Sequence, residues 1–408
     1  MENANVKYLV GDVFDKMKEL PDSSVDLVLT SPPFLALRSY LPADHPDKTK
    51  EIGSEATPAE FVDTLLRLTA EWRRLLAPHG SLCVELGDTF SGSGGGGGDF
   101  MPGSGEFDRF DPLIVEKPPK QDNSTGGWPL AKSLTLIPEA YRFALAYGTN
   151  PHTGTKSPAG QWRIRNVIRW VRPNPPVGAL GDKFRPATSE LVVACVSKDR
   201  YFDLDAVREP LTERAQAEIT QGGVSGGESY QGEASDWNGY KGERLRMPAA
   251  GGGAPPLDWW KISPKGYAGA HYAVWPSELC VKPIKAMSPR EVCRECGEPR
   301  RRVVDVEPSP NEGNWYHQGQ DGGSATGGTF RTVRKSTTLG WSDCGHDNYR
   351  PGLVLDPFAG TGTTLAVAHG HGRDAIGIDI DERSAELARE RVGPLFLEVV
   401  GLADGLRV

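Results

Sequence analysis

The chain has 408 residues, enough for two or three domains, and a formal net charge of −8. This acidic balance excludes a histone-like protein that binds nucleic acid by charge alone, but it allows an enzyme with one basic cleft. The 49 glycines and 33 prolines, with only 38% hydrophobic residues, predict much irregular structure between the packed elements.

No targeting or membrane segment is expected in this sequence. The N-terminal residues lack a basic start and an apolar stretch, and apolar runs such as 191–196 are too short to cross a bilayer. Six cysteines in so long a chain indicate reduced thiols or metal ligands, not a disulfide framework. We therefore expect a cytoplasmic protein with no membrane partner.

The first part of the chain alternates predicted strands and helices. A helix is predicted to begin at Thr57-Pro58, a capping residue followed by proline, and to end at Pro78–Gly80. Its apolar residues follow helical spacing: Phe61, Leu65, Leu68, Trp72 and Leu75. Short apolar runs predict strands at 8–10, 25–29 and 81–86. This spacing favours a parallel α/β sheet.

Less regular segments fill the middle of the chain. We expect a helix at 138–147 and strands at 162–171 and 191–196. The stretches rich in glycine and polar residues predict loops or insertions at 91–98, 212–256 and 319–328.

The clearest block lies near the C-terminal end. A strand at 353–355 leads through a glycine-rich turn into a helix from Thr363. A second strand at 375–380 and a helix at 382–391 complete a βαβ unit of the nucleotide-binding kind.

The glycine-rich turn is a candidate cofactor site. Gly360 and Gly362 allow the backbone to approach a ligand, and Asp379, about 20 positions later, can bind ribose hydroxyls. A P-loop would need Gly-Lys-Ser/Thr where this helix begins with Gly362-Thr363-Thr364, and a dinucleotide motif would need a third glycine. A corner without a ligand is the structural alternative.

A second candidate site, Ser31-Pro32-Pro33-Phe34, follows the predicted strand at 25–29. The lone pair of an exocyclic base amine is delocalised into the ring, so the amine is a poor nucleophile. The Ser31 hydroxyl and the Pro32 carbonyl can accept its hydrogens, and Phe34 can stack on a flipped base. An ordinary proline turn is the alternative.

The stretch Asp356-Pro-Phe-Ala-Gly-Thr-Gly-Thr-Thr364 resembles the S-adenosylmethionine motif of DNA amino-methyltransferases. Because the Ser-Pro-Pro-Phe motif precedes it, the chain is similar to the β-type, permuted group. The resemblance implies catalytic roles for Ser31, Pro32, Pro33 and Phe34. It implies that the cofactor contacts Asp12, Asp356, Phe358, Gly360, Gly362, Thr363 and Asp379. Ancillary elements include Asp88, which could line a pocket or cap a loop, and the segments 172–175 and 271–276.

The resemblance also implies a fold and an activity. The fold is the Rossmann-like α/β sheet of S-adenosylmethionine-dependent methyltransferases, of the seven-stranded type and assembled from both chain ends. We expect target-recognition and zinc-binding insertions between these ends. The activity is methyl transfer to the exocyclic amine of a flipped base in double-stranded DNA. Ser31 favours cytosine N4, with adenine N6 as the alternative. A bacterial or phage restriction-modification system, with a companion restriction enzyme, is implied.

Other classes stay open. One is a non-catalytic DNA-binding module with the same fold, and another is an RNA or protein-glutamine methyltransferase. A cytosine-C5 enzyme is disfavoured because no cysteine follows a proline, and Cys83 and Cys195 lie in apolar strands typical of a core.

The domain boundaries follow from these motifs. We expect five parts: the first catalytic part at 1–205, a glycine-rich recognition or mobile insertion at 206–270, a linker with a zinc-binding insert at 271–350, the cofactor-binding catalytic part at 351–396, and a C-terminal tail at 397–408.

A zinc site is predicted within the linker. Cys293 and Cys296 have knuckle spacing, and Cys344 and His346 complete a tetrahedral set. Unrelated surface thiols are the alternative, and Cys280 is a substitute ligand. Basic and aromatic residues lie between the two ligand pairs and predict either a DNA-facing or a solvated surface: 300–302, Trp315, Tyr316, Arg331, Arg334 and Lys335.

Overall fold

The computed structural model describes residues 5–37, 40–42, 44–92, 126–175, 182–210, 253–264, 275–307, 335–393 and 396–401. Predictions that fall on 93–98, 212–252, 271–274 and 319–328, with Trp315, Tyr316, Arg331 and Arg334, lie outside these residues. Contacts group the chain into two units, one of residues 1–202, 257–300 and 344–408, and one of 203–256 and 301–343.

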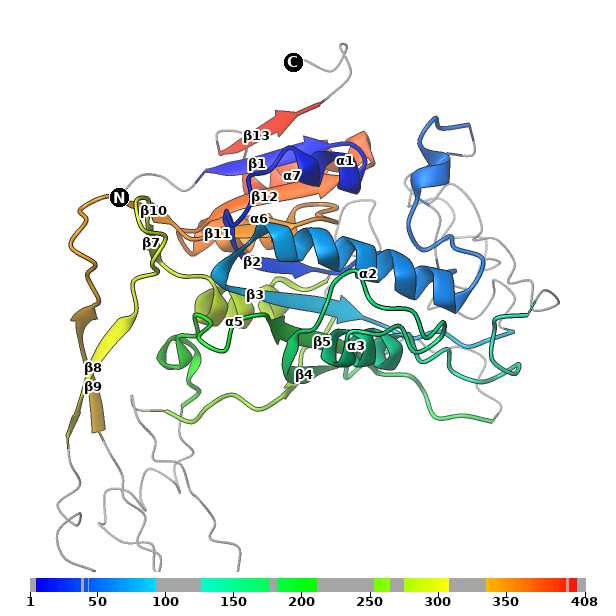
Figure 1. Ribbon diagram of the computed structural model, residues 1–408, viewed down its shortest axis with the longest axis horizontal. Coiled ribbons are helices and arrows are strands. Elements are labelled where there is room, and N and C mark those ends of the chain that lie inside the picture. The colour runs from blue at the N-terminus through cyan, green and yellow to red at the C-terminus, as the bar shows by residue number, and fades with distance from the viewer. Residues whose placement is uncertain are drawn as a thin grey trace, which may run out of the picture. The chain divides into compact units, whose positions relative to one another are not determined.

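The first unit contains a nine-stranded sheet in the order β13-β1-β12-β11-β2-β3-β5-β4-β6 (Figure 1). Its strands come from both ends of the chain: β1 (Val6–Val10), β2 (Val25–Thr30), β3 (Leu76–Leu86), β4 (Arg163–Val171), β5 (Thr188–Cys195), β6 (Trp259–Lys261), β11 (Leu353–Asp356), β12 (Asp374–Asp379) and β13 (Leu397–Val400). The strands from β13 to β3 are parallel, and β5 is antiparallel to both of its neighbours. The predicted assembly from both chain ends is therefore confirmed.

The sheet has two strands more than the seven expected. Strand β13 lies in the stretch predicted as a C-terminal tail, and pairs with β1. Strand β6 lies within the segment predicted as an insertion, and pairs with β4. At four and three residues, both strands are too short to show an alternating pattern in the sequence.

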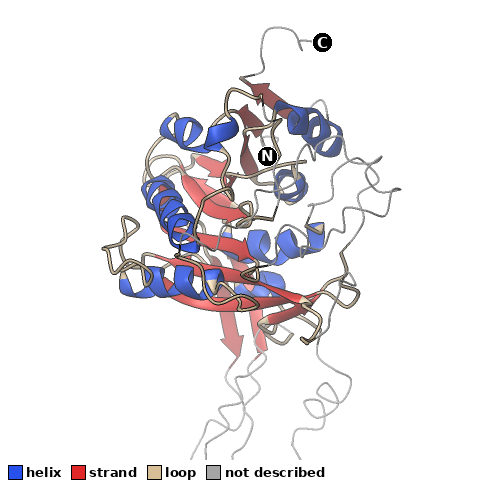
Figure 2. Ribbon diagram, turned by 90° about the vertical axis from the view of Figure 1, so that its right-hand side faces the viewer, coloured by secondary structure: helices blue, strands red, loops and turns tan. Residues whose placement is uncertain are grey.

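Helices cover both faces of the sheet (Figure 2). On one side α1 (Val13–Lys18), α2 (Pro58–Leu75) and α3 (Ile137–Tyr147) pack in series, and on the other α5 (Ser277–Met287), α6 (Thr363–Gly370) and α7 (Glu382–Val392) do the same. Thr57 and Glu60 form the capping box that begins α2, as its sequence predicts. The buried side chains of α2, Trp72 and Phe61 among them, form the centre of the core.

One helix boundary differs from the prediction. Helix α2 ends at Leu75 and β3 begins at Leu76, although Pro78–Gly80 were expected to separate a helix from a strand. The pairing of β3 with β2 jumps from Leu76 to Ser81, so these residues occupy an irregularity of the ladder. A proline is tolerated there because no ladder hydrogen bond is required of it.

Among the described residues, four short strands lie between α5 and β11 in the chain. Strand β7 (Glu291–Cys293) pairs antiparallel with β10 (Tyr349–Pro351), which runs directly into β11. In the second unit, β8 (Arg302–Glu307) and β9 (Lys335–Trp341) form an antiparallel pair. Arg302 binds Asp203 of the same unit with an N–O distance of 2.7 Å.

Candidate active site

The two predicted motifs end neighbouring strands. Strand β2, which leads into Ser31, pairs in parallel with β11, which leads into the glycine-rich turn. The Thr30 hydroxyl donates to the Asp356 carboxylate at 2.6 Å and joins the two strand ends directly. Ser31 and Gly360 therefore lie at one edge of the sheet although 329 positions separate them in the sequence.

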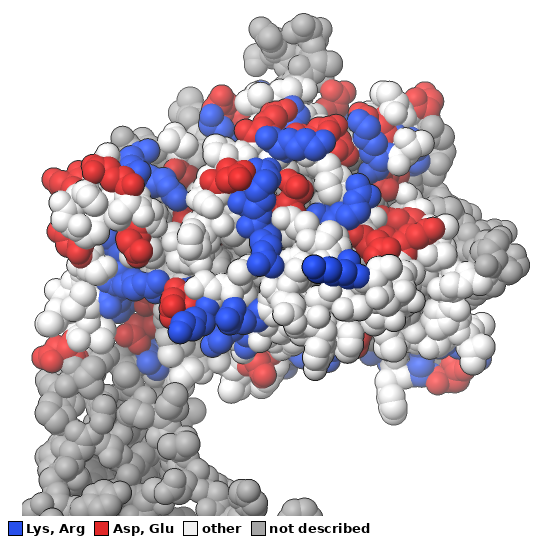
Figure 3. All heavy atoms as spheres, viewed as in Figure 1, with Lys and Arg blue, Asp and Glu red and all other residues white. Residues whose placement is uncertain are grey.

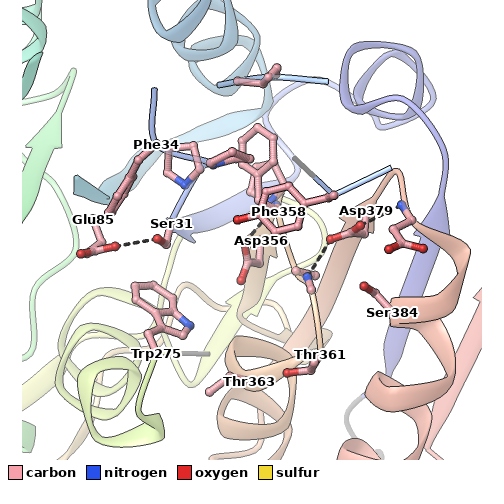
Figure 4. A pocket seen from close by; sticks show the side chains of 18 of the residues that line it. Ser31, Phe34, Glu85, Trp275, Asp356, Phe358, Thr361, Thr363, Asp379 and Ser384 are labelled. Carbon is pink, nitrogen blue, oxygen red and sulfur yellow. Dashed lines mark hydrogen bonds between the residues drawn. The ribbon is translucent and has the colours of Figure 1, made fainter. Parts of the chain in front are cut away.

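A cavity of about 410 Å³ opens at this edge, a size typical of small-molecule sites (Figure 4). Nearly all predicted site residues line it: Asp12, Ser31, Pro32, Pro33, Phe34, Asp356, Phe358, Gly360, Thr363 and Asp379. Gly362 is the exception. It lies behind the cavity, where an added Cβ would come within 3.0 Å of the Ala388 Cβ.

Backbone geometry shapes the glycine-rich turn. Gly360 and Gly362 have φ of +47° and +74°, in the left-handed region that favours glycine. The Gly360 N–H donates to Asp379 at 2.9 Å, and its carbonyl accepts from the Tyr8 hydroxyl at 2.7 Å. Gly377 on β12 makes room for the turn, since an added Cβ would lie 2.7 Å from that of Ala359. The sequence predicted neither Tyr8 nor Gly377.

Asp356 holds the turn in place. Its buried carboxylate accepts hydrogen bonds from Thr30 and Thr364, both at 2.6 Å, and from the Phe358 N–H at 3.2 Å. Burial raises the pKa of Asp356 to about 6, against the effect of these donors. Through these hydrogen bonds, Asp356 joins β2, β11 and α6.

Asp379 ends β12 beside the turn, where a ribose-binding carboxylate is expected. It accepts the N–H groups of Gly360 and Asp381, each at 2.9 Å. Removal from water, with the nearby Asp381 charge, raises its pKa to about 7. Asp12 lines the same cavity and caps α1 by accepting the Asp15 N–H at 3.1 Å.

Ser31 has a partner that the motif did not reveal. Its hydroxyl donates to Glu85 on β3, with an Oγ–Oε2 distance of 2.6 Å (Figure 4). Glu85 is 4% exposed, and burial raises its carboxyl pKa. A glutamate within the apolar run 81–86 was the available signal, because buried carboxylates are rare without a partner.

The rest of the target side is aromatic and polar. Phe34 lies against Gly87, where an added Cβ would come within 2.6 Å of the phenyl ring. The cavity is also lined by Trp170, Arg172, Asn174 and Trp275. Each of the two ancillary segments, 172–175 and 271–276, therefore contributes to it.

Other predicted residues have structural places. Asp88 does not line the cavity; it accepts the Leu136 N–H at 3.0 Å and the Thr135 hydroxyl at the beginning of α3. Cys83 and Cys195 are buried, and desolvation raises the pKa of the Cys83 thiol to about 12. Cys280 is buried beside Thr364, away from the predicted zinc ligands.

The predicted metal ligands meet, outside the cavity. One ligand atom from each of Cys293, Cys296, Cys344 and His346 lies within 4.8 Å of the others. Of the basic residues near them, Arg300 pairs with Glu291 at 2.9 Å. Arg302 is paired within the second unit, as described above. Arg301 and Lys335 also lie within the described ranges and the other residues of this surface do not, so the DNA-facing surface stays a prediction.

Basic and acidic side chains are interspersed on the face seen in Figure 3. Among the residues drawn in colour, no single-sign region covers this face, in keeping with the net charge of −8. Within the described ranges, no helix has the length and apolar character needed to cross a membrane.

Comparisons with known proteins agree with this geometry. The sequence pattern of the DNA methylase family matches residues 25–293 and 348–390. The Type II methyltransferase M.XycI of Xanthomonas campestris pv. cyanopsidis is 24% identical over 396 residues, 96% of this chain and 89% of that enzyme. M.SfiI of Streptomyces fimbriatus is 29% identical over 233 residues, 56% of this chain but only 45% of that enzyme.

Solved structures that align with most of this chain include the following two proteins. A Thermus thermophilus protein described as a putative DNA modification methylase, complexed with S-adenosyl-L-methionine, aligns over 98% of this chain and 99% of its own, with 17% identity and a TM-score of 0.45. The cytosine-N4-specific PvuII DNA methyltransferase aligns over 95% and 86%, with 13% identity and a TM-score of 0.48. Since both scores are modest, the assignment depends on the sequence match. Because that match covers more than half of the chain, the protein belongs to the DNA methylase family, the amino-methyltransferases that use S-adenosylmethionine.

Proposed function

We propose that the protein transfers a methyl group from S-adenosylmethionine to N4 of a cytosine flipped out of double-stranded DNA. The observation that carries this proposal is the Ser31–Glu85 hydrogen bond beside the glycine-rich turn, in one cavity of about 410 Å³. The first residue of the Ser-Pro-Pro-Phe motif is a serine. By its resemblance to the amino-methyltransferases, this residue favours cytosine over adenine as the target base. Methylation of adenine N6 is the second candidate.

The residues of the turn fit a nucleoside cofactor. Gly360 lets backbone approach a ligand, Phe358 offers an apolar wall, and the ionised Asp379 carboxylate can accept hydrogen bonds from ribose hydroxyls. When bound, S-adenosylmethionine supplies an electrophilic methyl group. Asp12 and Thr363 line the same side and are proposed as further contacts.

Ser31 orients the amine of the target base. Because its hydroxyl proton is donated to Glu85, the lone pairs of Oγ are left to accept an amine hydrogen. The Pro32 carbonyl is proposed as the second acceptor, and Pro33 restricts the backbone around it. These contacts draw the nitrogen lone pair out of the base ring and direct it toward the methyl group.

Glu85 can accept the proton that methyl transfer releases. As the new N–C bond forms, the amine must lose one hydrogen. The Ser31 Oγ can take that hydrogen while it passes its own to Glu85, whose raised pKa makes the carboxyl a better proton acceptor. Phe34, held against Gly87, is positioned to stack on the flipped base.

The biological setting is also proposed. The relatives M.XycI and M.SfiI are Type II methyltransferases, so we propose a restriction-modification role in the cytoplasm of a bacterium or phage-infected cell, with a companion restriction enzyme as partner. Target recognition is assigned to residues 206–270.

The test is methylation of defined DNA duplexes with labelled S-adenosylmethionine, followed by nucleoside mass spectrometry. N4-methylcytosine is the expected product. N6-methyladenine would show that the proposed base is wrong while amino methylation stands. Preferential labelling of tRNA in competition with duplex DNA, or absence of cofactor binding by calorimetry, would contradict the DNA-methyltransferase proposal itself.

A further inference from the structure

Two distances within the Cys/His cluster match the edge of a metal tetrahedron. The His346 Nδ1 lies 3.5 Å from the Cys293 Sγ and 3.5 Å from the Cys344 Sγ. Zinc–sulfur bonds of about 2.3 Å and zinc–nitrogen bonds of about 2.0 Å give a tetrahedral edge of about 3.5 Å between such atoms. The His346 Nδ1 thus has the separation from two sulfur atoms that one zinc ion requires, and all four ligand atoms lie within 4.8 Å of one another.

The backbone around Cys293 is arranged for a thiolate. The N–H groups of Glu295 and Cys296 donate to its sulfur at 3.4 and 3.5 Å. Gly297, with φ of +74°, closes this turn through its N–H bond to the Cys293 carbonyl at 3.0 Å. Two amides directed at one sulfur stabilise its charged form, which is the form that binds metal.

His346 is oriented by a second contact. Its Nδ1 is on the side of the sulfur atoms, and its Nε2 lies 3.7 Å from the Glu295 Oε2. A histidine ligand commonly presents its other ring nitrogen to a carboxylate, which sets the tautomer and the ring orientation. This arrangement is independent of the thiol spacing and also indicates a metal.

The cluster joins two chain segments at a strand pair. Cys293 ends β7 and is opposite Tyr349 of β10 in the ladder, and the Arg294 N–H donates to the Asn348 carbonyl at 2.9 Å. The next residue of β10, Arg350, binds Asp26 of β2 with an N–O distance of 2.6 Å. Strand β10 therefore connects the cluster to β2 and runs directly into β11.

We propose that Cys293, Cys296, Cys344 and His346 bind one structural Zn²⁺ that joins the two ends of residues 297–343 and holds β10 against β7. All four positions are taken by protein ligands, which is typical of structural and not catalytic zinc. The ion closes a long loop in the unfolded chain, so its binding stabilises the fold. The site lies outside the cavity and takes no part in methyl transfer.

Metal analysis of the full-length protein, purified without chelator, tests this site without DNA. We expect about one zinc per chain, and a Co²⁺-exchanged protein with the thiolate charge-transfer and d–d bands of a tetrahedral site. Cys344→Ser should lose the metal and these bands. Cys280→Ala, which removes a buried thiol outside the cluster, should keep both.

His346→Cys keeps the test decisive if Cys344→Ser does not fold, because four thiolates also form a zinc site. This variant should retain zinc, with a Co²⁺ spectrum shifted by the fourth sulfur, and chelator should lower the Tm of the wild-type protein. A folded wild-type protein without metal, or full zinc content in Cys344→Ser, would overturn the proposal. Neither result would bear on methyl transfer.

Discussion

The loop after β11 and the loop after β2 face the same cavity but are specified in different ways. The β11 loop depends on local features: two glycines with positive φ, a strand-end Asp356, and Asp379 one βα unit later. In the β2 loop, the Ser31 hydroxyl bonds Glu85, which lies on a third strand and 54 positions away. The β11 loop can therefore be predicted from contiguous sequence, whereas the partner of the β2 loop can be found only when the order of strands in the sheet is known.

This difference predicts which property of the protein is lost when each of the two loops is mutated. The β11 loop is held by backbone hydrogen bonds and close packing, so substitutions there should act on cofactor binding and stability. The β2 loop presents one hydroxyl whose state depends on a carboxylate. Substitutions there should act on the methyl-transfer step and leave cofactor binding unchanged.

The sharpest test of this division is Ser31→Ala. It removes the oxygen proposed to accept the amine hydrogen, and we expect kcat to fall about 10²- to 10³-fold with an unchanged cofactor Kd. Single-turnover methylation and calorimetry measure the two quantities. Ser24→Ala is the control, because that hydroxyl only bonds the Pro21 carbonyl in the turn before β2. Loss of cofactor binding in Ser31→Ala would break the proposed division.

The next test addresses the distant partner. Glu85→Gln keeps a hydrogen-bond acceptor for Ser31 but cannot take up its proton, so we expect kcat to fall about 10²-fold with little change in KM for DNA. The dependence of kcat on pH should change as well. Glu71→Gln, which affects only an ion pair of α2 with Arg74, should behave as wild type. Full activity of Glu85→Gln would reduce Glu85 to a packing role.

The β11 loop is tested by comparing two glycines. Gly362→Ala adds left-handed strain and contact with Ala388, and should lower the free energy of unfolding by about 2 kcal/mol and weaken cofactor binding. Gly372→Ala has similar strain, with φ of +68°, but meets no atom within 4 Å, so its cost should be about 1 kcal/mol. Equal costs, measured by denaturant unfolding, would show that packing against α7 is unimportant.

The smallest effect is a pH dependence of cofactor binding. Since the folded-state pKa of Asp379 is raised to about 7, this carboxyl makes the free protein less stable as pH rises from about 4 to about 7. Ribose hydroxyls prefer the ionised form, so cofactor affinity should increase about tenfold between about pH 6 and 8. Asp379→Asn should abolish this slope in calorimetry. Asp374→Asn, at the other end of β12, should retain it.

Much of the fold was predictable because its signals are local. Capping at Thr57, the apolar spacing of α2, and the turn from Asp356 to Thr364 each depend on neighbouring residues. The short strands β6 and β13 were not predictable, because pairing with existing strands, and not their own pattern, makes them part of the sheet. The same reason explains the continuation of β3 through Pro78–Gly80.

The sequence by itself determined the motifs: a serine-proline loop, a glycine-rich turn, a strand-end carboxylate and a Cys/His cluster. Tertiary structure alone decided that Ser31 meets Glu85, that Thr30 joins Asp356, and that Tyr8 supports Gly360. The physical reason is that these hydrogen bonds connect strands adjacent in the sheet but distant in the chain. The motif residues are encoded locally, whereas the partner of Ser31 and the way the motifs are held are decided by strand order.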